Sequence, residues 1–172
     1  MFISWTIGLC KWYNEPMTSR YPMLELDRQL CFPIYATARA VVRAYGPLLD
    51  SVGLTYPQYL TLLALWGSPD GPMTVGELGQ RLRLDTGTLT PLLKRLEKAG
   101  HLSRRRDPDD ERRVLLDLTD QGWALRDRVT DVPDELLRSL DLSAEDFAEL
   151  RRLLDQLLDQ LEHQTPPERT EG

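Results

Sequence analysis

Two short amphipathic segments joined by almost no linker constrain this fold more than any other feature of the sequence. The first, TVGELGQRLRL, begins with Thr74 and Glu77 in capping-box spacing, which marks a helix start. The second, DTGTLTPLLKRLEKAG, ends at Gly100, a residue type that stops helices well. Two short helices with so tight a join are typical of a helix-turn-helix. The apolar positions on one side are Val75, Leu78 and Leu82 in the first helix and Leu89, Leu92, Leu93 and Leu96 in the second.

A polar hairpin follows directly in HLSRRRDPDDERRVLLDLT. We expect strands at residues 102–104 and 114–118, connected by DPDDE, and then a long helix capped by Thr119. A helix-turn-helix followed by a hairpin predicts a winged helix. The expected fold is therefore mainly α with a small β-hairpin wing, in which a winged helix-turn-helix is flanked by N- and C-terminal helices.

The second helix and the hairpin carry the residues expected to contact DNA. Hydroxyls and free amides at a helix start bind phosphate, and the same end reaches base edges in a major groove. Basic side chains later in the helix reach the backbone, and arginines at the hairpin tip suit a minor groove, with Asp110 orienting Arg112. The predicted DNA-binding residues are Thr86, Thr88, Thr90, Pro91, Lys94, Arg95, Asp110, Arg112 and Arg113.

Charge is unevenly distributed along the chain. The net charge is −6, yet residues 81–113 hold ten Lys/Arg against six Asp/Glu, and residues 131–172 hold four Arg against twelve Asp/Glu. A basic middle on an acidic body suggests a local anion-binding face, but on charge alone we favour ordinary solvated surfaces. Two cysteines and two histidines show no zinc-ligand spacing, so we expect no metal and no cofactor. No apolar run approaches the roughly 20 residues that cross a bilayer, so no membrane partner is expected.

Helices are also expected before the helix-turn-helix. The pattern is helical from about Pro33 to Asp50, and proline is tolerated in a helix's first turn, so Cys31 falls at or just before the helix N-terminus. GLTYPQYLTLLALWG predicts a further helix, with Thr55 as its cap and Gly67 at its end.

The last helix begins at Ser143, with Asp146 three residues on, and carries a heptad seam. Such a seam packs either against its own domain or against a second subunit. We favour a homodimer interface shared with the N-terminal helix, because a DNA-binding protein gains from paired half-sites. The seam consists of Phe147, Leu150, Leu154, Leu157 and Leu161, widened by Leu153 and Leu158.

The N-terminal stretch MFISWTIGLCKWYNEPM is apolar but lacks the positive region of a signal peptide. We expect that this stretch is a loose extension, or that it follows from a start codon upstream of the true one at Met17 or Met23. A signal peptide is the alternative. The expected location is the cytoplasm, where thiols stay reduced. Cys31 could then be apolar filler, a metal ligand, half of a disulfide or a reactive thiol.

The stretch MTVGELGQRLRLDTGTLTPLLKRLEKAGHLSRRRDPDDERRVLLDLTDQG resembles the winged-helix core of the MarR family of bacterial transcription regulators. Asp110, Arg112, Leu118 and Thr119 fit a DxRxxxxxLT pattern, and the resemblance covers roughly residues 24–163. It implies a homodimeric transcription repressor that binds double-stranded operator DNA and is not an enzyme.

A narrower resemblance bears on Cys31. LDRQLCFPIYATAR, YGPLLD, LTYPQYL and LDTGTLTPLLKRLE are similar to the organic hydroperoxide sensors of that family. In those sensors the cysteine of the QLCF motif is the peroxide-reactive thiol, which implies this role for Cys31. The resemblance also implies that Tyr45 and Tyr56 hydrogen-bond the sulfur across the dimer, with Tyr35 in the same pocket. From their apolar character, Phe32, Ile34 and Leu30 are expected to line a mouth that prefers organic hydroperoxides to hydrogen peroxide.

The chemistry suits these residue types. A peroxide is attacked by thiolate, which a helix N-terminus and tyrosine hydroxyl donors stabilise, and the first product is a sulfenic acid. No cysteine follows Cys31, so we expect the sulfenic acid to react with a small cellular thiol or to oxidise further. A bridge to Cys10 is the internal alternative.

The expected function is repression that ends when an organic hydroperoxide oxidises Cys31 and the protein leaves its operator. Three alternatives stay open: a MarR-type repressor released by a small aromatic ligand, a thiol peroxidase, and a coiled-coil partner protein. In the first of these, Cys31 is a buried interface residue. The expected parts are a loose extension (1–23), a helix for dimerisation that carries the sensor cysteine (24–54), the winged helix-turn-helix (55–118), C-terminal dimerisation helices (119–163) and a disordered tail (164–172).

Overall fold

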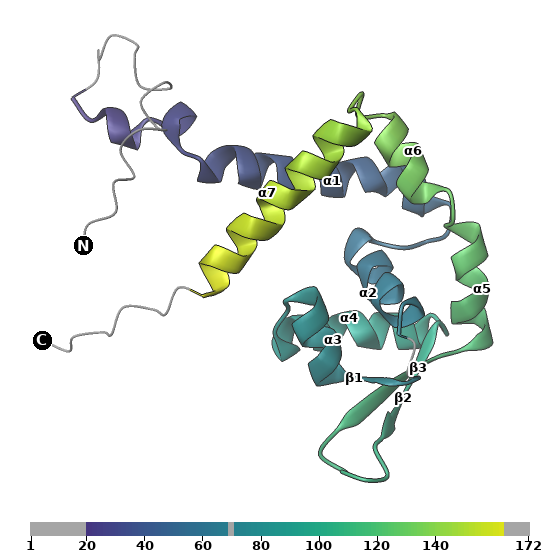
Figure 1. Cartoon of the computed structure of the whole chain (residues 1–172). Helices are drawn as coiled ribbons and strands as arrows, with labels where there is room; N and C mark the ends of the chain where they lie inside the picture. Colours follow the sequence, from purple (N-terminus) through teal and green to yellow (C-terminus); the bar gives the residue numbers. More distant parts are fainter. Residues whose placement is uncertain (1–19, 69–70, 164–172) are drawn as a thin grey trace, which may run out of the picture.

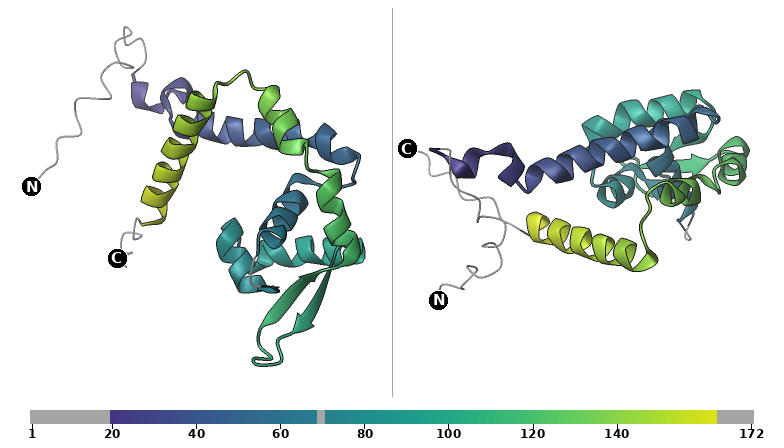
Figure 2. Two further views of the ribbon diagram at one scale, coloured as in Figure 1. Left: turned by 45° about the vertical axis from the view of Figure 1, so that its right-hand side comes forward. Right: turned by 90° about the horizontal axis from the view of Figure 1, so that it is seen from above.

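The computed structural model describes residues 20–68 and 71–163. Its elements are η2 (Pro22–Leu24), η3 (Leu26–Arg28), α1 (Cys31–Asp50), α2 (Tyr56–Trp66), β1 (Met73–Thr74), α3 (Val75–Leu82), α4 (Thr86–Lys98), β2 (Leu102–Arg106), β3 (Val114–Leu118), α5 (Asp120–Arg128), α6 (Val132–Arg138) and α7 (Ala144–Glu162). Figure 1 shows a winged-helix head built from α2, α3, α4 and the sheet, with α1 and α7 lying outside it. Figure 2 shows from two further sides that α1 extends away from this head. The last turn of α7 comes back to the head, where Glu162 forms an ion pair with Arg83 at the end of α3.

The core lies where α2, α3 and α4 pack together and against the sheet. The sheet is antiparallel with the order β1–β3–β2, so β3 is central. Leu116 of β3 pairs with Met73 and with Arg104, and its own side chain is buried. Leu62 and Leu93 are also fully buried, and burying one such side chain contributes about 1.5–3 kcal/mol. This packing fixes α4 relative to the wing formed by β2 and β3.

The predicted helix starts are confirmed by their capping contacts. Thr74 Oγ1 accepts from the backbone N–H of Glu77 at 3.1 Å, and Glu77 Oε2 accepts from the backbone N–H of Thr74 at 2.7 Å. Gly100, the predicted helix stop, has a φ of +78°, which glycine adopts without strain. Asp85, Thr119 and Ser143 each accept, through a side-chain oxygen, from the backbone N–H of the residue three positions later.

The structure corrects the predictions made for the segments around the wing. The expected long helix after Thr119 is wrong, because the chain forms two helices, α5 and α6, with a break between them. Pro133 has no N–H for the carbonyl of Val129 and its ring obstructs that carbonyl, so one helix cannot run through. The strand β2 continues to Arg106, beyond the predicted end, and β1 was not predicted because two residues are too few to show a pattern.

The outer helices leave apolar faces uncovered. Within α1 only Leu49 is buried, and within α7 no residue is buried. The heptad seam of α7 therefore does not pack against its own chain. Cys10, residues 1–19 of the predicted extension and the predicted tail lie outside the described residues.

Candidate functional site

The helix α4 presents one exposed face on the head. Its leucines Leu89, Leu92, Leu93 and Leu96 are buried, which turns the opposite side to solvent. An exposed, basic helix face flanked by a hairpin has the dimensions that enter a DNA major groove. Of the residues predicted to contact DNA on this helix, the structure leaves Thr86, Thr88, Pro91, Lys94 and Arg95 exposed and Thr90 partly exposed.

Hydrogen bonds divide the roles of the three threonines at the start of α4. Asp85 accepts from the backbone N–H and the hydroxyl of Thr88 at 2.8 and 2.9 Å, and these bonds hold the pKa of the Asp85 carboxyl below its usual range. The Thr90 hydroxyl donates to the carbonyl of Thr86 at 2.7 Å. Among the described residues the Thr86 hydroxyl has no such partner, so Thr86 is the threonine best placed to donate to a phosphate.

Pro91 also lies on this exposed face. Its missing N–H removes one backbone hydrogen bond from the middle of α4. Its ring presents an apolar surface of the kind that contacts a thymine methyl group.

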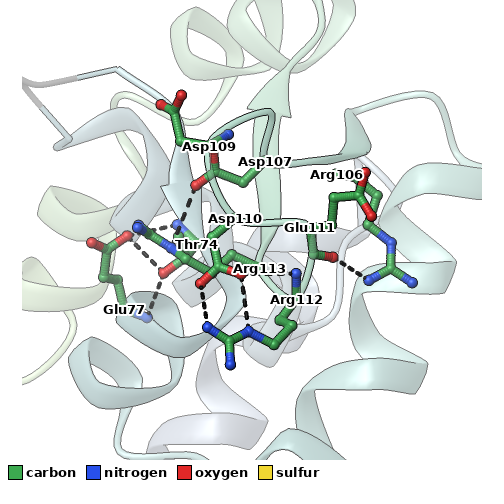
Figure 3. A network of polar contacts seen from close by, with 9 residues as sticks. All are labelled: Thr74, Glu77, Arg106, Asp107, Asp109, Asp110, Glu111, Arg112 and Arg113. Atoms are coloured by element: carbon green, nitrogen blue, oxygen red, sulfur yellow. Dashed lines mark hydrogen bonds and ion pairs between the residues drawn. The ribbon is translucent and has the colours of Figure 1, made fainter.

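The wing tip holds one arginine outward. Arg112 Nε donates to Asp110 Oδ1 at 3.1 Å, while its side chain stays 91% exposed (Figure 3). Hydrogen bonds from the Arg112 side chain, and then from its backbone, keep the pKa of the Asp110 carboxyl below its usual range, so the carboxylate stays ionised. The predicted orienting role of Asp110 therefore has a geometry that supports it, and Arg112 is free to enter a minor groove.

Arg113 is held differently from Arg112. Its Nε lies 3.4 Å from Oδ2 of the buried Asp107, and its charge also acts on Glu77 (Figure 3). Arg113 is therefore tied to the wing turn, unlike Arg112, but its side chain stays half exposed, and its contact with DNA stays a prediction. Asp107, which the sequence did not single out, further accepts from the backbone N–H of Asp109 at 3.0 Å and shapes the wing turn.

The predicted sensor residue Cys31 is the first residue of α1, and its side chain is exposed. No other cysteine occurs among the described residues. Phe32 and Tyr35 lie in the same first turns, with exposed fractions of 39% and 58%. A helix N-terminus offers free amides and a positive dipole end, which favour a negative charge such as a thiolate.

Three tyrosines meet at the junction of α1 and α2. The ring of Tyr45 lies 4.6 Å from that of Tyr56 and 5.7 Å from that of Tyr59, measured between centroids. Burial raises the pKa of Tyr45 and of Tyr56, with the neighbouring Tyr56 adding to the shift of Tyr45. These hydroxyls therefore keep their protons and can donate. The sequence missed Tyr59, which its spacing of three residues after Tyr56 on a helix could have revealed.

The structure does not bring Cys31 and these tyrosines together within one chain. Cys31 and Tyr45 are 14 residues apart on the continuous helix α1, which separates them by about 21 Å at the helical rise. The Tyr56 ring packs against that of Tyr45 at a tilt of 32° and lies at the same far end. Any contact between the sulfur and these hydroxyls requires a second subunit.

Comparisons with known proteins agree with the head geometry. Residues 43–129 match the family described as transcriptional regulator SarA/Rot. An organic hydroperoxide resistance transcriptional regulator of Bacillus subtilis (strain 168) is 43% identical over 145 residues, which cover 84% of this chain and 97% of that protein. The HTH-type transcriptional regulator TtmR of Methylorubrum extorquens (strain PA1) is 48% identical over 140 residues, covering 81% and 69%.

Solved structures also match regulators of this kind. Reduced AbfR of Staphylococcus epidermidis bound to DNA superposes with a TM-score of 0.69 at 35% identity, covering 80% of this chain and 93% of that one. The chain belongs to the MarR/SarA-type winged-helix transcription regulators. This MarR/SarA-type regulator shares its fold even with the distant S. aureus MepR in its DNA complex, at a TM-score of 0.70 and 23% identity. The predicted winged-helix fold and the predicted family are thus confirmed.

The regulator is a DNA-binding protein, and α4 and the wing are the parts that suit this activity. In residues 20–68 and 71–163 no cluster of histidine, cysteine, aspartate and glutamate is arranged to hold a metal ion. Over the same residues, no helix combines the length and the apolar character that a bilayer crossing needs.

Proposed function

We propose that this regulator is a homodimeric repressor that releases its operator when an organic hydroperoxide oxidises Cys31. The observation that carries the proposal is the spacing along α1. Cys31, Ala38 and Tyr45 are seven residues apart, so they lie on one face of the helix. A twofold axis at Ala38, where two antiparallel α1 helices cross, places Cys31 against the partner subunit's Tyr45. Ala38 is exposed and small, which lets the two helices approach closely.

The uncovered apolar faces support a dimer of this kind. Leucines of the α7 seam such as Leu150, Leu154 and Leu161 are 46–56% exposed in the single chain. Apolar surface on this scale is normally buried against a partner. Two subunits would also present two α4 helices to successive half-sites of an operator.

The proposed reaction is a two-electron oxidation of the sulfur. The Cys31 thiolate attacks the terminal, hydrogen-bearing oxygen of the hydroperoxide, an S–O bond forms and the O–O bond breaks. The product is the sulfenic acid of Cys31, and the organic alkoxide leaves and takes up a proton as an alcohol. A small cellular thiol can then condense with the sulfenic acid to give a mixed disulfide and water.

Oxidation changes the contacts at the dimer interface. A sulfenic acid no longer presents the anionic acceptor that the hydroxyls of Tyr45 and Tyr56 bind. Since α1 packs against both α2 and α6, a shift at this interface reaches the head and the C-terminal helices together. A change in the spacing of the two α4 helices is enough to lose paired half-sites.

The names of the relatives agree with a redox response. The Bacillus subtilis relative is a regulator of organic hydroperoxide resistance, and AbfR has been crystallised in reduced, overoxidised and disulfide forms. The chain covers 97% of the Bacillus subtilis protein, so the resemblance is not confined to the head.

A second candidate function rests on a cavity of about 310 Å³ between α2, α5 and α6. Tyr59, Leu63, Trp66 and Arg126 line it, which is a set of aromatic and apolar walls with one cation. Such a cavity suits a small aromatic acid, whose binding would act on the same junction as the redox response.

The decisive experiment is a mobility shift on the DNA upstream of the gene. Reduced wild-type protein should bind, cumene hydroperoxide should release it, and Cys31→Ser should stay bound in peroxide. Cys10→Ser is the matched control and should respond like the wild type. Release of Cys31→Ser by the peroxide would refute the proposal, and its release by benzoate alone would favour the cavity.

A further inference from the structure

A pair of side chains on α1 stands one turn beyond Cys31. Arg39 Nη1 donates to the hydroxyl oxygen of Tyr35 at 2.9 Å, and the Arg39 Cζ lies 5.6 Å from the centroid of the Tyr35 ring. Cys31, Tyr35 and Arg39 follow one another at intervals of four residues. Arg39 therefore covers Tyr35. Because side chains on a helix lean toward its N-terminus, the turn within reach of Tyr35 on that side is the one that holds Cys31.

This contact determines what the Tyr35 hydroxyl can do. A phenol has one proton to give and an oxygen that accepts. When the Arg39 guanidinium donates to that oxygen, the O–H must point to another acceptor. A donor from a permanently charged group also polarises the phenol and strengthens the bond that the phenol itself donates.

We propose that Arg39 is a positioning residue of the redox site: it holds and polarises Tyr35 so that the Tyr35 hydroxyl donates to a Cys31 thiolate. This inference rests on the proposed function. The pair is exposed, so it contributes little to folding and its effect falls on the sulfur chemistry. Arg43 stands one turn further along α1, is also exposed and makes no contact with Tyr35.

The test uses reduced, full-length protein and has two readouts. The first is the rate at which a stoichiometric amount of cumene hydroperoxide oxidises the Cys31 thiol. The second is the ultraviolet absorbance of the thiolate at neutral pH. Arg39→Gln should slow oxidation about 3- to 10-fold, the scale of one lost hydrogen bond, and should lower the thiolate absorbance. Arg39→Lys keeps a cationic donor and should restore most of the rate. Arg43→Gln is the matched control and should oxidise like the wild type.

A double-mutant comparison identifies the route of the effect. Tyr35→Phe should slow oxidation as much as Arg39→Gln, and the double variant should be no slower than either. A wild-type rate in Arg39→Gln, or additive losses in the double variant, would overturn the inference. Operator binding by each reduced variant verifies folding. If peroxide oxidises Cys31 but leaves the protein on DNA, the proposed function fails while the Arg39 comparison still stands.

Discussion

At the scale of single residues, the wing tip separates the two arginines that the sequence places side by side. Arg112 is 91% exposed and is oriented by Asp110, whereas Arg113 is tied to the buried Asp107. An exposed arginine held by a carboxylate is ready to enter a minor groove without first losing much side-chain freedom.

We therefore predict that Arg112→Ala weakens operator binding by about 10-fold or more and lowers the salt dependence of binding by about one counterion. Asp110→Asn should weaken binding less, because the arginine keeps its charge but loses its ionised partner. Titration by fluorescence anisotropy at several salt concentrations checks both. Arg151→Ala removes the same charge from α7, which lies apart from the wing (Figure 1), and should bind DNA like the wild type. Equal losses in Arg112→Ala and Arg151→Ala would mean that only net charge matters.

The residue types at the wing were predictable from sequence, and their directions were not. Alternating acids and arginines in DPDDERR indicate a charged turn, which identified Asp110 and Arg112. Whether Arg113 reaches Asp107 depends on the hairpin register, which sets which side chains face the head. The order of charged residues in the sequence does not reveal this register.

At the scale of elements, local signals determined most helix boundaries. Thr74, Thr119 and Ser143 cap helices where the sequence predicted, because capping depends on residues within one turn. The break between α5 and α6 was missed although Pro133 marks it, since the prediction used only the cap at Thr119 and not this proline. Local rules therefore recovered helix starts better than helix lengths.

The junction of α1 and α2 depends on buried phenols, and its stability should respond to alkaline pH. Burial, with the nearby Tyr45 and Tyr56, raises the pKa of Tyr59 to about 12 from 10.0. The folded state therefore holds this proton more tightly than the unfolded chain does. The resulting stabilisation is complete below about pH 10 and is lost as the pH rises toward about 12, by roughly 2–3 kcal/mol.

Tyr59→Phe keeps the ring packing and removes the titrating group. Urea unfolding at pH 8 and at pH 11 should then show a smaller loss of unfolding free energy for Tyr59→Phe than for the wild type. The loss should not vanish, because Tyr45 and Tyr56 also have raised pKa values. An identical loss in both proteins would mean that Tyr59 is not the group responsible.

At the scale of the whole molecule, the proposed redox site is not contained in one chain. Cys31 and the tyrosines lie at opposite ends of α1, and the seam of α7 is exposed. The spacing of residues along the sequence predicts which side of its helix each residue occupies. It does not predict a contact between two subunits, because nothing in the neighbouring sequence indicates the partner. The resemblance to organic hydroperoxide sensors supplied the pairing, and the seven-residue intervals around Ala38 give it a physical basis.

If the α7 seam closes the dimer, a charge at its centre should separate the subunits. We predict that Leu154→Glu yields monomers in sedimentation velocity, because a carboxylate cannot be buried unpaired in an apolar interface. Each head would then bind one half-site alone, so operator affinity should fall on the order of 10²-fold or more through loss of bivalency.

Gln156→Glu adds the same charge to the outer side of α7, outside the heptad seam, and should remain dimeric with wild-type affinity. If the Leu154→Glu variant stays dimeric, α1 alone forms the dimer interface. In that case Cys31 and the partner's Tyr45 would still meet at the Ala38 crossing, and the peroxide response should persist in Leu154→Glu. Loss of the response together with the dimer would instead mean that α7 holds the two α1 helices in register, so that the sulfur chemistry depends on a seam far from it in sequence.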